Sequence, residues 1–315
     1  MKCKGLSLLS GGLDSQLAVR VLERAGAYVE AVAFETPFFS SAKARAAATA
    51  LGVKLRTIDF LEDEISLVEN PPHGFGGAMN PCIDCHARMI HRAGELMTQL
   101  GFDFVATGEV RGQRPMSQNA QSLVTVEKAS GLKGRLIRPL SAKLLEPTIP
   151  EQEGLLDRDK LLDISGRSRD RQIALAAEFG ITDYPSPAGG CKLTEDAYGR
   201  KLRDLMEHEG LRDATGAANR GLLELLATGR HFRLPGGSSV ILGRDANENA
   251  LLRRCTAGTP HRVVVEPQGR VPGPTAFVPD LKSADDLEIV RGIVRAWTRG
   301  TTDKDRAPFK QYQLT

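Results

Sequence analysis

The residues most suited to chemistry form a hexapeptide near the start of the chain, S-G-G-L-D-S at positions 10–15. It follows a short apolar run that predicts a buried strand, and it precedes apolar residues at helical spacing. Two adjacent glycines permit a tight turn and a close approach of the backbone to a ligand. The free N–H groups of the following helix would face the same ligand. We therefore expect Ser10, Gly11, Gly12 and Ser15 to bind an anion such as a pyrophosphate group.

Asp14 stands inside this anion-binding loop. A negative charge is unfavourable there unless a cation such as Mg²⁺ bridges it to the phosphates. We therefore expect Asp14 to act in catalysis through a bound Mg²⁺ ion. The hexapeptide differs from the G-x-x-x-x-G-K-S/T loop, because no Lys follows it, and from the G-x-G-x-x-G turn. An ordinary strand–turn–helix with an Asp cap is the alternative interpretation.

Three of the five cysteines are spaced for metal or sulfur chemistry. Cys82 and Cys85 form a C-x-x-C pair on one face of the first turn of a predicted helix, where thiolate character is favoured. Cys191 follows two glycines, which we expect to allow a close backbone approach. Five cysteines in 315 residues are too sparse for a disulfide scaffold. The pair therefore indicates metal, cluster or sulfur chemistry, and the lone Cys3 and Cys255 are expected to be structural.

An alternation of strands and helices must position these residues. This β-α-β-α order predicts an α/β fold with a parallel sheet and helices on both faces. Right-handed crossovers would place the loops that follow the strands along one edge, where ligands bind. Apolar runs predict strands at 6–9, 29–34, 53–60 and 102–107, and helical spacing predicts helices at 13–22, 41–51 and 83–100.

The last third of the chain has a different character. Short β-like runs at 231–234, 239–242 and 262–266 and an amphipathic helix at 287–297 predict a small α+β domain. We place the boundary after residue 205, which gives domains 1–205 and 206–315. The second domain holds 13 Arg and three Lys against seven Asp and six Glu. This excess of Arg suits contact with phosphate or nucleic acid, and a solvated Arg-rich surface is the alternative.

Composition excludes some classes of protein. No run of 18 apolar residues is present, so we expect no membrane span and no membrane partner. The apolar stretch after Met1 is too short for a signal peptide and enters a Gly-Gly turn. We therefore expect a cytoplasmic location. Whether the chain forms a homodimer is left open.

The S-G-G-L-D-S loop after a first strand resembles the pyrophosphate loop of the ATP pyrophosphatase superfamily. This resemblance implies the Rossmann-like fold of the adenine nucleotide alpha hydrolase-like group. It also implies that ATP binds over residues 10–15 with Mg²⁺ and is cleaved between its α and β phosphates. A carbonyl or amide oxygen would thereby be activated as an adenylate. Phe34, at the end of the second predicted strand, would then lie beside the adenine or pack in the core.

Three further segments resemble those of the tRNA 2-thiouridylases within this superfamily: N-P-C-I-D-C at 80–85, A-T-G-E-V at 106–110 and G-G-C at 189–191. The resemblance implies an ATP-dependent tRNA sulfurtransferase that makes thiouridine, with tRNA as a partner. It implies catalytic roles for Cys82 and Cys191.

The A-T-G-E-V segment implies a second set of contacts. Thr107 and Gly108 would lie near the nucleotide, as the T-G position does in the thiolases. Glu109 replaces the usual His of the family's A-T-G-H segment. The detailed role of that position therefore does not transfer to this chain.

Four interpretations of the cysteines stay open. The related sulfurtransferases with iron–sulfur clusters imply a [4Fe–4S] cluster on Cys82, Cys85 and Cys191, with one iron open to carry sulfide. A Zn²⁺ ion could use the same cysteines with His86 or His91. A persulfide or disulfide relay would need no metal. Inert buried thiols are the fourth interpretation.

Residues 228–299 resemble the RNA-binding module of the NFACT ribosome-quality-control proteins, which implies that the second domain grips RNA. The resemblance rests on S-V-I-L-G-R-D-A-N-E-N-A-L-L at 239–252 and a later V-P-G-P. Gly243, Arg244 and Asp245 would form a polar turn that contacts phosphate or base edges.

Other functions stay open beside tRNA thiolation. They are a cluster-dependent desulfidase of thiolated bases, a non-catalytic RNA-binding protein regulated by ATP, and an ATP-dependent amidating enzyme. Because the chain has no rhodanese-like domain, sulfur must come from outside, as sulfide or from a cysteine desulfurase or another persulfide carrier.

Overall fold

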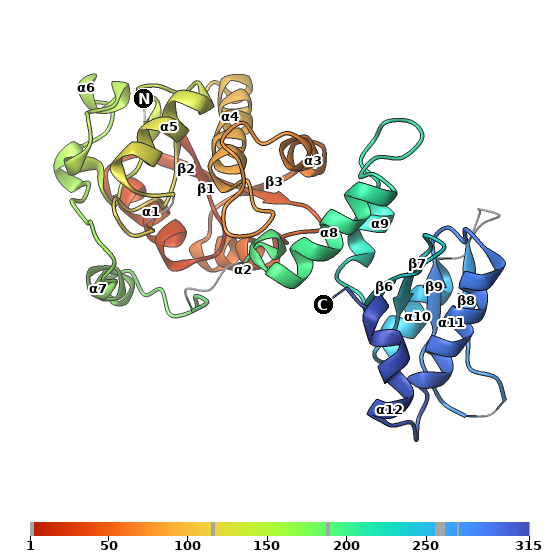
Figure 1. Cartoon of the computed structure of the whole chain (residues 1–315). Coiled ribbons are helices and arrows are strands. Elements are labelled where there is room, and N and C mark those ends of the chain that lie inside the picture. Colours follow the sequence, from red (N-terminus) through yellow and green to blue (C-terminus); the bar gives the residue numbers. More distant parts are fainter. Residues whose placement is uncertain (1–2, 115–116, 187–189, 256–261, 270, 315) are drawn as a thin grey trace. The chain divides into compact units, whose positions relative to one another are not determined.

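The computed structural model describes residues 3–114, 117–186, 190–255, 262–269 and 271–314. The chain divides into two compact units, Met1–Lys192 and Leu193–Thr315, which are described separately (Figure 1). The expected boundary after residue 205 falls inside helix α8 (Asp196–His208), which belongs to the second unit. Cys191 therefore belongs to the first unit, with the other candidate site residues.

A five-stranded parallel sheet forms the centre of the first unit, as the sequence predicts. The strand order is β3-β2-β1-β4-β5, so the chain reverses direction across the sheet after β3. The loops after β1 and β4 therefore lie side by side at the carboxyl edge, where ligands bind in open α/β sheets. The strands are β1 (Lys4–Leu8), β2 (Tyr28–Glu35), β3 (Leu55–Asp59), β4 (Phe104–Ala106) and β5 (Leu136–Ile137).

Helices cover both faces of this sheet (Figure 1). Alternate residues of β2 point to opposite faces: Ala31 and Ala33 join one core, whereas Val32 joins the other. The first core is completed by α1 (Leu13–Arg24), α2 (Ala42–Leu51) and α7 (Asp170–Glu178). The second contains α4 (Cys82–Leu100) and α5 (Ala120–Ser130), with α3 (Leu61–Glu69) packed on α4. The shorter helices are η1 (Ala142–Leu144), α6 (Ile149–Gln152), η2 (Arg158–Lys160) and η3 (Lys192–Thr194).

The second unit is a small α+β domain, also as predicted. Its antiparallel sheet has the order β6-β7-β9-β8. Phe232 of β6 and Val290 of α11 are fully buried in its core. The strands are β6 (Arg230–Arg233), β7 (Ser239–Leu242), β8 (Val263–Val265) and β9 (Ala276–Val278). The helices are α8, α9 (Arg220–Leu225), α10 (Ala246–Arg254), α11 (Ala284–Ala296), α12 (Asp303–Arg306) and η4 (Ala307–Tyr312).

Strand β9 lies at the end of a Pro- and Gly-rich span, residues 267–279. The three residues Ala276, Phe277 and Val278 are buried, and they pair with β7 on one side and β8 on the other. The prolines and glycines precede this short apolar run. They break the chain before the strand and leave the strand itself uninterrupted.

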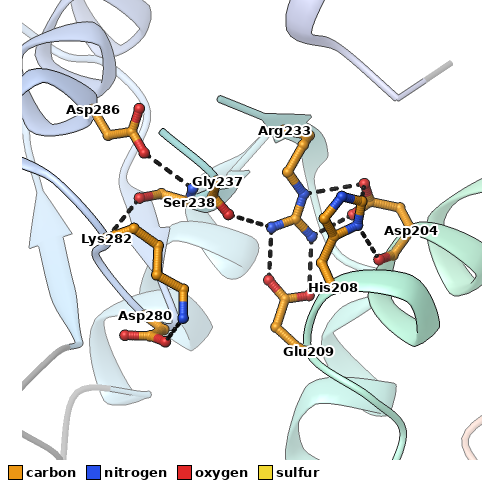
Figure 2. A network of polar contacts seen from close by, with 9 residues as sticks. All are labelled: Asp204, His208, Glu209, Arg233, Gly237, Ser238, Asp280, Lys282 and Asp286. Atoms are coloured by element: carbon orange, nitrogen blue, oxygen red, sulfur yellow. Dashed lines mark hydrogen bonds and ion pairs between the residues drawn. The ribbon is translucent and has the colours of Figure 1, made fainter. Parts of the chain in front are cut away.

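A polar network ties α8 and the residue that follows it to the β6–β7 hairpin (Figure 2). The Arg233 guanidinium donates to both carboxylate oxygens of Asp204, at 3.1 and 2.6 Å, and to both of Glu209, at 2.7 and 2.9 Å. It also donates to the carbonyl oxygen of Gly237 at 2.6 Å. Two carboxylates thus neutralise this guanidinium, and the network fixes α8 in the second unit.

No helix within the described ranges is both long enough and apolar enough to cross a membrane.

Candidate nucleotide and sulfur site

The S-G-G-L-D-S segment forms a closed turn between β1 and α1. Gly11 has φ +83°, and a Cβ on it would lie 2.6 Å from the backbone of Lys43, so only glycine fits. Gly12 is the N-cap of α1 and has no side chain to occupy the helix N-terminus. The hydroxyl of Ser15 donates to the Gly12 carbonyl at 2.8 Å and lies 3.3 Å from that of Ser10. The hydroxyls thus stabilise the turn itself, and the N–H groups at the start of α1 are left to face an anion.

Asp14 lies in the first turn of α1, and only one of its two carboxylate oxygens accepts a hydrogen bond within the described part of the chain. Its Oδ2 accepts a hydrogen bond from Nε2 of Gln113 at 2.7 Å, and Gln113 in turn accepts one from Gln172 at 2.9 Å. Its Oδ1 is buried and has no hydrogen-bond partner among the described residues. An orphaned carboxylate oxygen beside an anion-binding turn fits a Mg²⁺ ligand.

The loop after β4 packs directly on this turn. A Cβ at Gly108 would lie 2.6 Å from the backbone of both Asp14 and Ser15, so the two loops approach as closely as backbone allows. The Thr107 hydroxyl is buried and donates to Oε2 of Glu109 at 3.0 Å. Gly108 therefore packs on the turn at residues 10–15, whereas the Thr107 hydroxyl points to a carboxylate. Contact of these two residues with a nucleotide stays a prediction.

Glu109 is the centre of a buried charge network. Its carboxylate accepts a hydrogen bond from Nε of Arg138 at 2.7 Å and lies 3.0 Å from Nδ1 of His86. Burial alone would raise the pKa of Glu109, but the charges of His86 and Arg138 hold it well below its usual value. Arg138 also donates to Glu127 at 3.2 Å and to the Leu123 carbonyl at 3.0 Å. The Glu109 carboxylate thus contacts an imidazole supplied by α4.

Cys82 and Cys85 begin α4 but lie in different surroundings. The side chain of Cys82 is exposed, and its sulfur accepts a hydrogen bond from the Asn80 amide at 3.1 Å. Cys85 donates to Oε2 of Glu64 at 3.0 Å. Burial, followed by the negative charge of Glu64 and the nearby Cys191 and Cys82, raises the pKa of the Cys85 thiol well above its usual value. Burial also raises the pKa of Glu64 to about 7, so the surroundings of this pair favour the protonated form of both groups.

Cys191 belongs to the same cluster, because its charge and that of Cys82 both act on Cys85. The next residue is anchored: the backbone N–H of Lys192 donates to the Phe38 carbonyl at 3.0 Å. A Cβ at Gly190 would meet nothing within 4 Å, so the expected close approach does not occur there. Gly189 lies outside the described residues.

The remaining two cysteines lie apart from this cluster, and their expected structural role stays a prediction. Cys3 is buried, and its burial is the main cause that raises its pKa to about 12. The Cys255 thiol donates to the Leu251 carbonyl at 3.3 Å. Neither belongs to the cluster of the other three, so Cys82, Cys85 and Cys191 stay the candidates for sulfur chemistry.

The cysteine cluster as placed does not form a metal site. Among the described residues, no three His, Cys, Asp or Glu side chains are arranged to hold a metal ion. The Cys85 thiol is directed at Glu64, and a carboxylate beside a thiol disfavours the thiolate that a metal requires. His86 and His91, the expected further zinc ligands, are directed at Glu109 and at the Ser130 carbonyl.

Phe34 lies in the core beside the site. It is 7% exposed and packs edge-on against Phe60, with ring centroids 5.3 Å apart. Its burial matches the core alternative, and a contact with adenine stays a prediction.

Motif reasoning missed Glu64 as a functional candidate, and it missed the contact of His86 with Glu109. Glu64 carries a signal in the sequence, because Leu61, Glu64, Ile65 and Val68 share one face of α3 and all four are buried. A carboxyl group on the apolar face of a helix needs a specific partner. His86 carries no such signal, because its contact with Glu109 depends on how α4 packs against the loop after β4.

A family model matches the first part of the chain. Residues 1–143 match the family described as "Thiamine biosynthesis protein (ThiI)", a segment that contains the phosphate turn, Cys82 and Cys85. Cys191 and the second unit lie beyond the matched segment. No curated protein matches the chain significantly.

Solved structures of similar fold include three with low sequence identity. A 4-thiouridine synthetase–RNA complex with bound ATP is 19% identical at a TM-score of 0.37, covering 57% of this chain and 52% of that one. A predicted tRNA methyltransferase subunit from Methanocaldococcus jannaschii is 16% identical at a TM-score of 0.36, and the match covers 56% of this chain and 76% of that one. An NMN synthetase from Francisella tularensis is 12% identical at a TM-score of 0.29, and the match covers 60% of this chain and 90% of that one. The chain thus spans about half the length of the 4-thiouridine synthetase.

Proposed function

We propose that the chain is an ATP-dependent tRNA sulfurtransferase, which adenylates a nucleobase carbonyl and replaces its oxygen with sulfur to give a thiouridine. The phosphate turn would bind ATP, and the cysteine cluster would handle sulfur. The match of residues 1–143 to a family named for thiamine biosynthesis, which requires sulfur transfer, supports the sulfur half of this proposal.

The observation that carries the proposal is a continuous set of contacts between the two halves of the site. Gly108 packs on the backbone of Asp14 in the phosphate turn. Glu109, the next residue, contacts His86, and His86 follows Cys85 on α4. An activated oxygen above the turn would therefore be within a few residues of the groups that supply its replacement.

In the first step the phosphate turn orients the β and γ phosphates of ATP, and the nucleobase oxygen attacks the α phosphorus. The P–O bond to the β phosphate breaks, pyrophosphate leaves, and the base carries AMP. Backbone N–H groups at Gly12 and the start of α1 stabilise the negative charge that develops on the leaving phosphates. Asp14 would hold a Mg²⁺ ion through Oδ1, and the ion would neutralise part of that charge.

In the second step a persulfide on one cysteine attacks the activated carbon, and AMP leaves with the oxygen. The second cysteine then attacks the sulfur of the first, which releases the thiolated base and leaves a disulfide. Cys82 and Cys191 would form this pair, because Cys85 keeps its proton beside Glu64. A persulfide carrier supplies each new sulfur atom, and a thiol reductant outside the chain reduces the disulfide.

A substitution of Cys191 tests whether the cysteines transfer sulfur while the turn at residues 10–15 cleaves ATP. We expect Cys191→Ala to lower the sulfur content of the tRNA by at least about a thousandfold, because the group that resolves the intermediate is lost. Release of pyrophosphate should change by less than about twofold, because the phosphate turn is intact. The measurement combines ³⁵S incorporation into tRNA with a pyrophosphate assay. Cys255→Ala is the matched control and should retain both activities; thiolation by Cys191→Ala at the rate of the unsubstituted chain would refute the role.

The [4Fe–4S] cluster on Cys82, Cys85 and Cys191 stays a prediction, since the placed side chains do not form a metal site. Cluster binding would require Cys85 to leave Glu64 and lose its proton. Anaerobic purification followed by an absorption spectrum and metal analysis decides the question. About four irons per chain and a brown colour support the cluster. About one zinc supports the alternative, and metal-free protein that still thiolates tRNA supports the relay.

The second unit would bind the RNA. This proposal extends the resemblance of residues 228–299 to the NFACT RNA-binding module. Two polar side chains near Gly243 bind the backbone of the domain itself: Asp245 accepts a hydrogen bond from the N–H of Asn247, and Asn249 accepts one from the N–H of Thr275. These side-chain oxygens are thus less available to contact RNA. Arg244 is the residue of this turn whose charge is left half-exposed at the surface.

The name of the matching family favours a second acceptor, an intermediate of thiamine biosynthesis. The same site could deliver sulfur to it. Incubation with ATP, a ³⁵S persulfide source and tRNA, followed by separation of RNA from small molecules and proteins, distinguishes the two. Label in nucleosides of digested tRNA supports the first proposal, and label confined to other fractions supports the second.

A further inference from the structure

Two arginines on strand β6 differ in whether carboxylates neutralise their charge. Arg233 is neutralised by the carboxylates of Asp204 and Glu209 (Figure 2). The guanidinium of Arg230 is half-buried, and within the described part of the chain it makes no hydrogen bond or ion pair. A half-buried guanidinium that no carboxylate contacts directly is costly, so an anion from outside the chain that bound it would stabilise this arrangement.

Further cations surround Arg230 and increase that cost. Burial lowers the pKa of Arg230, and the charges of Arg244 and Arg306 lower it further. Burial and then Arg244 likewise lower the pKa of Lys201. The contacts place these cations together: Lys201 and Arg244 donate to the adjacent carbonyl groups of Leu226 and Ala227, at 3.2 and 3.4 Å, shortly before Arg230 in the chain. Arg244 therefore lies within electrostatic reach of both Arg230 and Lys201.

The acceptors already present neutralise these groups only in part. Lys201 donates to the Leu226 carbonyl at 3.2 Å, which carries no net charge. Arg244 is paired with Glu248, the carboxylate that also moderates the charges on Lys201 and Arg230. Glu248 thus acts on all three cations, Glu195 also acts on Lys201 and Asp245 on Arg244, but Arg230 forms no hydrogen bond with a carboxylate among the described residues. A phosphate group would supply that missing partner.

We propose that Arg230, Arg244 and Lys201 form a binding site for a backbone phosphate of RNA at the start of β6. This inference rests on the proposed function, in that RNA is the macromolecule that the second unit binds. The inference names the residues that bind the RNA and identifies the backbone phosphate as the group that these residues contact.

The shape of the surface favours the backbone of a polymer over an enclosed small anion. The cavity that adjoins Lys201 and His231 has a volume of about 20 Å³, which holds one water molecule and no phosphate. The side chain of Arg244 is 50% exposed. The phosphate must therefore lie on the open surface, as the phosphates of a bound nucleic acid do.

The experiment measures the affinity of the full chain for a fluorescently labelled tRNA transcript by anisotropy, at salt concentrations from about 50 to 200 mM. We expect Arg230→Ala and Arg244→Ala each to weaken binding about tenfold at the lowest salt, since each removes a charged hydrogen bond to phosphate. The slope of log Kd against log salt should fall by about one for each variant.

Stability separates a ligand site from a structural role. Arg230→Ala removes an uncompensated half-buried charge, so its melting temperature should equal or exceed that of the unsubstituted chain while its RNA affinity falls. A role in holding the fold would lower the melting temperature. The matched control is Arg291→Ala, which removes an exposed arginine paired with Glu288 on α11 and should leave the affinity unchanged.

Three results would overturn the inference. They are no binding of tRNA by the unsubstituted chain, an unchanged affinity and salt slope in both variants, and competition by millimolar inorganic phosphate as strong as that by unlabelled tRNA. The last would indicate a site for free phosphate. Failure of the proposed function gives a different pattern, because a chain that binds tRNA through these residues but incorporates no sulfur would retain the affinity differences.

Discussion

Replacement of Asp14 with Asn is expected to lower the release of pyrophosphate from ATP by a factor of about a hundred to a thousand. The substitution preserves shape and removes the charge on Oδ1, the buried oxygen that has no partner among the described residues. Without that charge the phosphates lose the cation that Asp14 would hold. Gln113 can still donate to the remaining carbonyl oxygen, so the fold of the turn should be retained. The measurement is a coupled pyrophosphate assay with ATP, Mg²⁺ and tRNA.

The control for this prediction lies on the same helix. Glu23 is in the last turn of α1, where it pairs with Arg20 at 2.7 Å. Glu23→Gln removes the same charge far from the phosphate turn and should leave the rate within about twofold of the original. A melting temperature for Asp14→Asn close to that of the unsubstituted chain would exclude unfolding as the cause. Full release of pyrophosphate by the Asn variant would contradict adenylation at this turn.

Glu109→Gln should produce the largest loss of stability, about 3–5 kcal/mol. The substitution leaves the Arg138 guanidinium, which is only 2% exposed, without its principal counter-ion. It also leaves His86 without the carboxylate that lies 3.0 Å from its Nδ1. For a unit of this size the loss corresponds to a fall of about 10 °C in melting temperature. Differential scanning calorimetry of the purified variant measures it.

The same arginine supplies the matched control. Arg138 also pairs with Glu127 at 3.2 Å, and the Glu127 side chain is 30% exposed. Water can replace much of that interaction, so Glu127→Gln should cost less than about 1 kcal/mol. Equal melting temperatures for Glu109→Gln and Glu127→Gln would show that burial does not determine how much each ion pair contributes to stability.

The first sheet could be predicted from the sequence because its strands are apolar runs separated by amphipathic helices. The buried residues of β1, β2 and β4 lie where those runs predict them. Strand β5 was not predicted, because Leu136 and Ile137 form only two paired positions. A strand that short has no detectable period, and its pairing with β4 is determined by tertiary structure.

The candidate site could be predicted only in part, for a related reason. Gly11, Asp14, Cys82 and Cys85 belong to local motifs whose spacing indicates chemistry. The partners of these residues come from distant segments: Gln113 for Asp14, and Glu64 for Cys85. Such pairs depend on how the helices pack, and a single sequence does not contain that information. The interpretation of the cysteines changes most, since Glu64 keeps a proton on one of the three.

The closed turn at residues 10–15 has a consequence for the thermodynamics of binding. The turn is held by the contact of Gly11 with the Lys43 backbone and by the hydrogen bond from Ser15 to Gly12. Its conformational entropy is therefore lost when the protein folds, and little more is lost when a nucleotide arrives. ATP should meet a preorganised receptor, and mutations that loosen the turn should weaken binding mainly through entropy.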